Sequence, residues 1–121
     1  MMKPVTFDTL VGKTIERIDN NNDEELIFTL VDGTRYRMFH VQNCCEGVYL
    51  EDVEGGDLQS VCGDPVLQAE EATQEADTNA YGTGTWTFYK LATIKASVTL
   101  RWLGESNGYY SESVDFMQEE R

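Results

Sequence analysis

One short turn, with alternating apolar and polar residues on both sides, constrains this chain more than any other feature. Residues 25–30 and 34–41 flank a Val-Asp-Gly turn at 31–33, which suits a three-residue hairpin loop. Side chains along a strand point to opposite faces in turn, so the alternation indicates two paired, half-buried strands. The loop predicts that Leu26 pairs with Met38, Phe28 with Tyr36 and Leu30 with Thr34. His40 continues the apolar face that this pairing creates.

Further strands are predicted where β-branched and aromatic residues cluster between turns rich in glycine or asparagine. They cover residues 13–18, 48–53, 85–91, 97–103 and 110–116. Residues 66–75 fit either a helix or an edge strand, because Ala and Glu favour a helix while Val66 and Thr73 permit a strand. We expect a loop at 76–84 and a frayed tail at 117–121.

The turn around Asn107-Gly108 sets the register of a second predicted hairpin. A three-residue loop pairs Val98 with Phe116 and Leu100 with Val114, which buries apolar groups together. A two-residue loop would instead set Leu100 opposite Asp115. We therefore prefer the three-residue loop.

Two short helical turns complete the predicted elements. Thr6 can cap a turn over residues 7–11, and Asp57 can cap one over 58–62; a glycine follows each turn. The chain has 121 residues, enough for one domain over 1–121 and too short for two. The predicted fold class is α+β and β-rich: one twisted, mostly antiparallel sheet of about six or seven strands, with one or two short helices. Its core is expected to include Trp86, Phe88 and Tyr89.

The charge of the chain excludes some partners and suggests others. It has 22 acidic and 9 basic residues, a net charge of −13, and no Lys or Arg between Arg37 and Lys90. Nucleic-acid phosphates and anionic membranes repel such a chain, whereas basic protein surfaces attract it. The acids predicted to bind a basic partner are Glu46, Glu51, Asp52, Glu54, Asp57, Glu70 and Glu71. The simpler and more common explanation is that acidity only keeps the protein soluble.

The three cysteines favour a reducing compartment and include one candidate nucleophile. Their odd number argues against a disulfide framework, and the adjacent Cys44 and Cys45 are sterically poor partners for each other. With no apolar leader at the start, we expect a cytoplasmic protein. Cys45 and His40 are the catalytic candidates if the protein is an enzyme, although structural roles are more common for both types. Their spacing suits zinc poorly, so no metal or cofactor is expected.

A candidate ligand site lies in the aromatic C-terminal third. Arg101, Trp102, Ser106, Asn107 and Tyr110 group a cation, hydroxyls, an amide and stackable rings around one hairpin tip. Such a set suits a base or sugar-like ligand. A polyanionic ligand would also need a local positive pocket, for which the candidates are Arg35, Arg37, Lys90, Lys95 and Arg101. The alternative is a hairpin whose rings only close one end of the core.

Three strings resemble a family of small uncharacterised proteins from tailed phages and prophages. They are HVQNCCE at 40–46, WTFYKLATIK at 86–95 and RWLGESNGYYSESV at 101–114. The resemblance covers roughly residues 10–116. It implies no established activity, and no functional residue can be carried over. Because many short accessory phage proteins counter host defences, it favours an anti-defence role by analogy alone.

Three functional hypotheses follow. The first is a non-enzymatic phage accessory protein in the host cytoplasm, which occludes a basic, nucleic-acid-handling surface of a host defence complex as an anti-CRISPR protein or DNA mimic would. The second is a small-ligand or nucleotide-signal binding protein, and the third is a Cys–His hydrolase or transferase. The sequence leaves open the oligomeric state, including a homodimer, and whether His40, Cys45 and Arg101 share one site.

Overall fold

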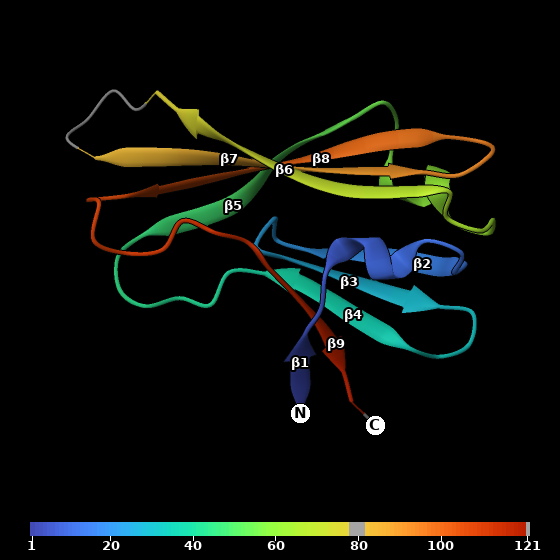
Figure 1. The fold of residues 1–121 in the computed structure, drawn as a ribbon. Helices are drawn as coiled ribbons and strands as arrows, with labels where there is room; N and C mark the ends of the chain where they lie inside the picture. The colour runs from blue at the N-terminus through green and yellow to red at the C-terminus, as the bar shows by residue number, and fades with distance from the viewer. Residues whose placement is uncertain (78–81, 121) are drawn as a thin grey trace.

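Two antiparallel β-sheets, stacked face to face, form the part of the chain that the structure describes, residues 1–77 and 82–120 (Figure 1). The structure is a computed structural model. The first sheet has the order β1 (Met2–Pro4), β9 (Asp115–Glu119), β4 (Arg35–Phe39), β3 (Glu25–Leu30) and β2 (Ile15–Asn21). The second sheet has the order β5 (Gly47–Glu54), β8 (Ser97–Ser106), β7 (Thr83–Ala92) and β6 (Gln68–Ala76).

The predicted β-rich, mostly antiparallel architecture is confirmed, but the strands form two sheets rather than one, and the protein is closer to an all-β fold than to α+β. Each sheet has one apolar face, and two such faces can cover each other without help from helices. The helical elements among the described residues are two short 3-10 turns, η1 (Phe7–Leu10) and η2 (Leu58–Val61). Asp57 caps η2 as predicted, since its carboxylate accepts hydrogen bonds from two backbone amides of that turn. Thr6 precedes η1 without a capping hydrogen bond.

The hairpin of β3 and β4 has the predicted register. Leu26 lies opposite Met38, Phe28 lies opposite Tyr36, and the Leu30 amide donates a hydrogen bond to the Thr34 carbonyl. The turn contains Gly33 at a φ of 89°, a conformation that favours glycine. The His40 side chain, which follows β4, is 3% exposed and so continues the buried face.

The predicted pairing of residues 110–116 with β8 is wrong. β8 already has β5 on one side and β7 on the other, so neither of its edges is free. The chain instead crosses to the first sheet, where β9 pairs with β4 and β1. The crossing segment runs close over β8, because a Cβ on Gly104 would lie 2.4 Å from the carbonyl oxygen of Glu112. Only a glycine at position 104 lets the crossing segment approach β8 this closely.

The C-terminal residues are not a frayed tail, because β9 is an interior strand of the first sheet. Met117 lies opposite Arg37 on β4 and opposite Pro4 on β1. Phe116 anchors the strand, since its ring stacks on Tyr36 with centroids 5.4 Å apart. Arg121 lies outside the described residues.

The ambiguous segment 66–75 is mostly an edge strand, β6, in which Ala69 is buried opposite Leu91. The predicted loop at 76–84 is shorter than expected, since β6 runs to Ala76 and β7 begins at Thr83. Residues 78–81 of that loop lie outside the described part of the chain.

Aromatic rings from both sheets form the centre of the core. Phe7 of η1 makes edge contacts with Tyr89 of the second sheet and Phe116 of the first, at centroid distances of 4.8 and 5.2 Å. Tyr89 is buried as predicted, whereas Trp86 and Phe88 lie outside the core. No helix in residues 1–77 and 82–120 has both the length and the apolar character needed to cross a membrane.

Candidate functional site

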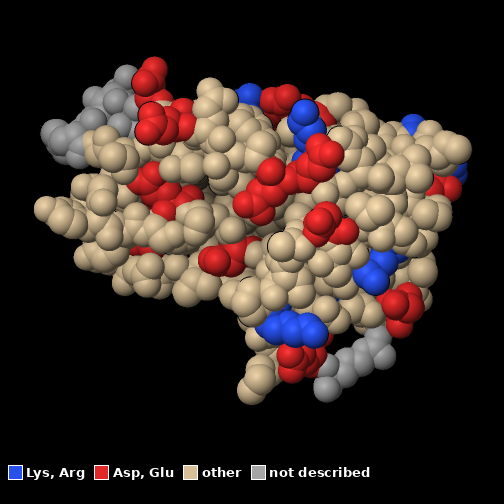
Figure 2. All heavy atoms as spheres, in the orientation of Figure 1, with Lys and Arg blue, Asp and Glu red and all other residues tan. Residues whose placement is uncertain are grey.

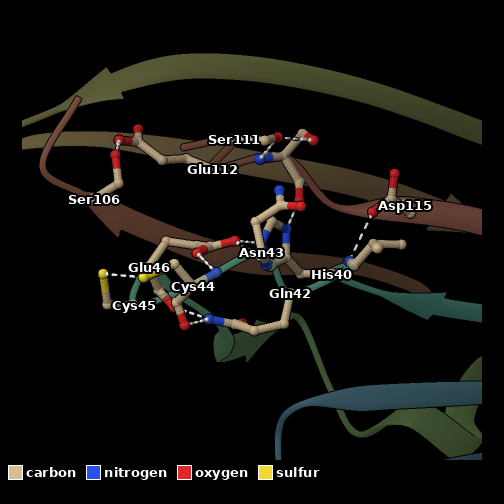
Figure 3. A network of polar contacts seen from close by, with 12 residues as sticks. His40, Gln42, Asn43, Cys44, Cys45, Glu46, Ser106, Ser111, Glu112 and Asp115 are labelled. Carbon is tan, nitrogen blue, oxygen red and sulfur yellow. Dashed lines mark hydrogen bonds and ion pairs between the residues drawn. The ribbon is translucent and has the colours of Figure 1, made fainter. Parts of the chain in front are cut away.

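A buried histidine joins two loops that are far apart in the sequence (Figure 3). His40 is the first residue of the β4–β5 connection, and its ring lies between Glu46 of that connection and Ser113 of the segment that leads from β8 into β9. Its Nδ1 is 2.7 Å from the Ser113 carbonyl oxygen, and its Nε2 is 2.6 Å from Glu46 Oε2. The His40 and Glu46 side chains are 3% and 0% exposed. We call this arrangement, with the two backbone amides described next, the His40–Glu46 clasp.

Glu46 is held by donors from three residues. Besides His40, the backbone amides of Asn43 and Cys44 donate hydrogen bonds of 2.9 Å to its carboxylate. The hydrogen bond with His40, supported by these amides, lowers the pKa of Glu46 from 4.5 to about 2, although burial acts in the opposite direction. Glu46 is therefore ionised inside the protein. The prediction that Glu46 binds a partner from the surface is therefore wrong, because its side chain is buried.

The clasp leaves His40 poorly placed to activate a thiol. Both of its ring nitrogens already have a partner, the Ser113 carbonyl and the Glu46 carboxylate. Neither nitrogen is then free to take a proton from Cys45. The pKa of Cys45 is raised, chiefly by its hydrogen bond with Cys44, whereas an activated nucleophile needs a lowered one. This geometry favours a structural role for His40.

The two adjacent thiols lie beside the clasp. Cys44 and Cys45 are both exposed, and their Sγ atoms are 2.7 Å apart. The hydroxyl of Tyr110, on the crossing segment, lies close enough to the Cys44 side chain for the pKa of Tyr110 to be raised. The structure thus brings a predicted ligand residue to the predicted thiol site. Across the described residues, no three His, Cys, Asp or Glu side chains are grouped so that they could hold a metal ion.

The other predicted ligand residues do not share a site with Tyr110. Trp102 is fully buried on the inner side of β8, whereas Arg101 lies on the other side of the same strand, over the Trp86 ring. The Ser106 hydroxyl donates a hydrogen bond to Glu112, and the Asn107 side chain accepts one from the Tyr109 amide at 3.1 Å. These last two contacts shape the turn that follows β8.

The basic residues that a polyanion would need are scattered. Arg35 and Arg37 lie on β4, in the first sheet, and each pairs with an acid of that sheet. Lys95 lies in the β7–β8 turn and pairs with Asp64. Lys90 and Arg101 are on the second sheet, and Arg101 is engaged by two carboxylates. These five cations do not converge on one pocket.

The solvent-facing side of the second sheet, which we call the outer face, carries a group of partly exposed rings. Cross-strand pairing places Tyr49 opposite Leu103, and Leu103 opposite Trp86. Phe88 stacks against Trp86 with ring centroids 6.3 Å apart. The guanidinium of Arg101 lies 5.0 Å from the centroid of the Trp86 ring. Tyr49 is 38% exposed, and the other rings are half-buried.

The assignment of Trp86 and Phe88 to the core is therefore wrong. Side chains alternate between the two faces along a strand, so Trp86, Phe88 and Lys90 share one face of β7 while Tyr89 and Leu91 share the other. Lysine is almost never fully buried. Trp86 and Phe88 lie four and two residues before Lys90 on the same strand, so they share its face. This spacing is the sequence signal that identifies the two rings as outward-facing.

Acidic residues surround the rings of the outer face. They are Glu51, Asp52, Glu54, Glu70 and Glu105, against the two bases Lys90 and Arg101. Glu51 and Glu54 bind Arg101 at 2.6 and 2.8 Å, so that cation is already neutralised. On the side of the molecule in Figure 2, acidic side chains spread across the surface while the basic ones stand apart from each other.

The remaining acids predicted to bind a partner lie elsewhere. Glu46 belongs to the clasp, and Asp57 caps η2. Glu71 lies opposite Tyr89, on the inner side of the sheet, and its side chain contacts the Tyr89 hydroxyl. Of the seven predicted acids, the outer face therefore collects Glu51, Asp52, Glu54 and Glu70.

Comparison with known proteins identifies a family. The model of a domain of unknown function, DUF7448, matches residues 8–116, a range that contains both the clasp and the outer face. No curated protein and no solved structure gives a significant match. The family match says nothing about a phage origin, which stays a prediction. Because the match spans most of the sequence, the chain belongs to the DUF7448 family of domains of unknown function.

Proposed function

We propose that this protein is a non-enzymatic binding protein whose outer face docks on the basic surface of a nucleic-acid-handling protein and occludes it. The observation that carries the proposal is the group of partly exposed rings, Tyr49, Trp86 and Phe88, surrounded by acids on a solvent-facing sheet. The paired strands β7 and β8 form the centre of this surface.

The rings supply the binding energy in this proposal. Trp, Tyr and Arg are enriched among interface residues whose truncation costs about 2 kcal/mol or more. Here Trp86 is already packed against both Phe88 and Arg101, so little side-chain freedom is left to lose on binding. Exposed apolar groups with a polar rim are typical of protein interaction sites.

The acids select the charge of the partner. Five carboxylates and two cations give the outer face a net negative charge. Such a surface repels DNA and RNA but complements the lysines and arginines of a protein that binds them. The resemblance to phage proteins makes a host defence complex in the host cytoplasm the first partner to test.

The two other hypotheses have less support. A nucleotide binder would need cations that converge, and Arg101 is instead held by Glu51 and Glu54. A Cys–His enzyme would need a free ring nitrogen, and His40 has an acceptor at each one.

The proposal predicts that outer-face variants lose affinity in a salt-dependent way. A partner recovered from host lysate would be purified and titrated at about 0.05 and 0.5 M NaCl. The double variant Trp86→Ala, Phe88→Ala should weaken binding about tenfold or more at both salt concentrations. The charge variant Asp52→Asn, Glu70→Gln, Glu105→Gln should weaken it about tenfold at low salt and little at high salt.

A matched control separates the outer face from net charge. The control variant carries three substitutions on or next to the first sheet, Glu16→Gln, Asp19→Asn and Glu120→Gln, which change the net charge by the same amount. Its affinity for the partner should stay within about twofold of that of the wild type. Equal losses in the two charge variants would refute docking through the outer face. An affinity that does not change with salt would rule out a basic partner.

A further inference from the structure

Cys44 and Cys45 stand out because both are exposed and their sulfurs are in contact. The Sγ–Sγ distance is 2.7 Å, close to the bonding distance of roughly 2.05 Å in a disulfide. Cys62, the third cysteine, lies apart at the end of η2, where its thiol contacts the Leu58 carbonyl. The adjacent pair is therefore a dithiol, and Cys62 offers an internal comparison.

The loop around the pair is held by its neighbours. The Cys44 amide donates to Glu46 of the clasp, and the Gln42 side-chain amide donates to the carbonyls of Cys44 and Glu46 at 3.0 and 2.6 Å. The backbone is thus restrained on both sides of the two cysteines, as Figure 3 shows. The thiols are kept together on one side of the loop rather than left to point apart.

We propose that Cys44 and Cys45 form a redox-active dithiol that a small disulfide, such as oxidised glutathione, converts reversibly into a disulfide between the two adjacent residues. The Cys44 thiolate attacks the small disulfide and releases one glutathione thiolate, which leaves a mixed disulfide on Cys44. The Cys45 thiolate then attacks the Cys44 sulfur and releases the second glutathione. The protein loses two protons and two electrons, and these convert oxidised glutathione into two thiols.

The surrounding donors identify Cys44 as the attacking sulfur. Hydrogen bonding to Cys44 is the main reason why the pKa of Cys45 is raised, and it also raises the pKa of Tyr110. Both groups therefore keep their protons and can donate to the Cys44 sulfur. Cys44 is thus the sulfur that contacts both of these groups. Cys45, which keeps its proton longer, fits the resolving role.

The geometry also explains why this disulfide would be easy to reduce. Neighbouring Cα atoms are about 3.8 Å apart, below the usual disulfide range of about 4.4–6.8 Å. The same short distance is the reason why the sequence predicts poor disulfide partners in Cys44 and Cys45. Strained, exposed disulfides have higher reduction potentials and serve labile or regulatory roles rather than structural ones. The inference concerns the loop beside the clasp and does not depend on the proposed function of the outer face.

The test is equilibration of the purified, reduced chain with mixtures of oxidised and reduced glutathione, followed by alkylation of free thiols and mass spectrometry. A protease that cuts after glutamate is required, because no Lys or Arg separates the three cysteines. As the mixtures become more oxidising, the peptide with Cys44 and Cys45 should lose two hydrogens and escape alkylation. Cys62 should remain alkylated, and the change should reverse with excess reduced glutathione.

Two variants complete the test. Cys45→Ser removes the resolving thiol, so a stable glutathione adduct should accumulate on Cys44. Cys62→Ser should oxidise like the wild type. The proposal fails if wild-type Cys44 retains glutathione, if disulfide-linked dimers form instead, or if Cys44 and Cys45 stay as fully alkylated as Cys62 in every mixture.

Discussion

Glu46 keeps its charge inside the protein because hydrogen-bond donors from His40, Asn43 and Cys44 replace the water that burial removes. Removing one partner of such a buried pair leaves a charge without compensation, which destabilises a fold strongly. The clasp also ties the β4–β5 connection to the segment before β9, through the contact between His40 and Ser113. His40, a catalytic candidate in the sequence, and Glu46, a candidate for partner binding, therefore both stabilise the fold.

The clasp predicts a specific dependence of stability on pH. The pKa of Glu46 is about 2 in the folded protein against an ordinary 4.5. Because the folded value is lower, ionised Glu46 stabilises the fold above pH 4.5, and this contribution is lost as the pH falls from 4.5 towards 2. The variant Glu46→Gln should be less stable than the wild type near neutral pH, and the difference should shrink across that window. Urea unfolding at a series of pH values measures it.

The control is the variant Glu16→Gln, which replaces an exposed carboxylate. It should change the urea midpoint far less than Glu46→Gln does. A difference between wild type and Glu46→Gln that stays constant down to pH 2 would mean that the variant loses packing rather than charge.

The sequence identified some residues of this site but not their partners. His40 was predictable as a buried residue, because it continues the apolar face of a hairpin with a local register. Ser113, which accepts its hydrogen bond, is 73 residues away, and no local pattern connects the two. Tyr110 was assigned to a ligand site with Arg101, yet it meets Cys44.

Among the elements, β9 differs most from the sequence-based expectation, because it lies inside the first sheet between β4 and β1. Its backbone groups are paired on both sides, as Gln118 lies opposite Tyr36 on β4 and opposite Lys3 on β1. The short N-terminal strand β1 therefore depends on β9 for its place in the sheet.

A chain that ends at Phe116 tests this position. It keeps the buried ring of Phe116 but loses the ladder hydrogen bonds of residues 117–119. These residues form three register pairs with β1 and two with β4. At about one hydrogen bond for each pair and about 1 kcal/mol for each bond, the free energy of unfolding should fall by about 5 kcal/mol. Urea unfolding measures the change, and hydrogen exchange should show faster exchange along β4. A frayed tail would leave both measurements unchanged, and that result would contradict the interior position of β9.

For the whole molecule, the excess of acids bears on stability as well as on binding. A net charge of −13 on a chain of this size destabilises the compact state through self-repulsion. Ion pairs such as Arg17 with Glu16 are exposed, and exposed pairs contribute little to stability. We therefore expect the repulsion between distant charges to outweigh the contribution of the exposed ion pairs.

Salt should therefore stabilise this protein. Raising NaCl from about 0.02 to 0.3 M screens the repulsion, and we expect the Tm to rise by about 3 °C. Differential scanning calorimetry measures the change. KCl should act like NaCl, because screening depends on ionic strength and not on the identity of the ion. A fall in Tm would show that local ion pairs outweigh the self-repulsion.

The sequence by itself determined the features that depend on neighbours along the chain. The register of β3 and β4 follows from a short loop and period-two alternation. The Asp57 cap of η2 follows from one side chain and the nearby amides of Gln59 and Ser60. The net charge also follows from composition alone.

Only the tertiary structure decided which strands share an edge, which face of β7 meets solvent and which loops meet at His40. The predicted last hairpin had a sound local register, but β5 and β7 occupy both edges of β8, so β9 pairs elsewhere. Each edge of a strand accepts one neighbour, and the choice depends on the free energy of contacts between residues far apart in the sequence. Such competition cannot be read from any local window, because each candidate pairing looks favourable when it is considered alone.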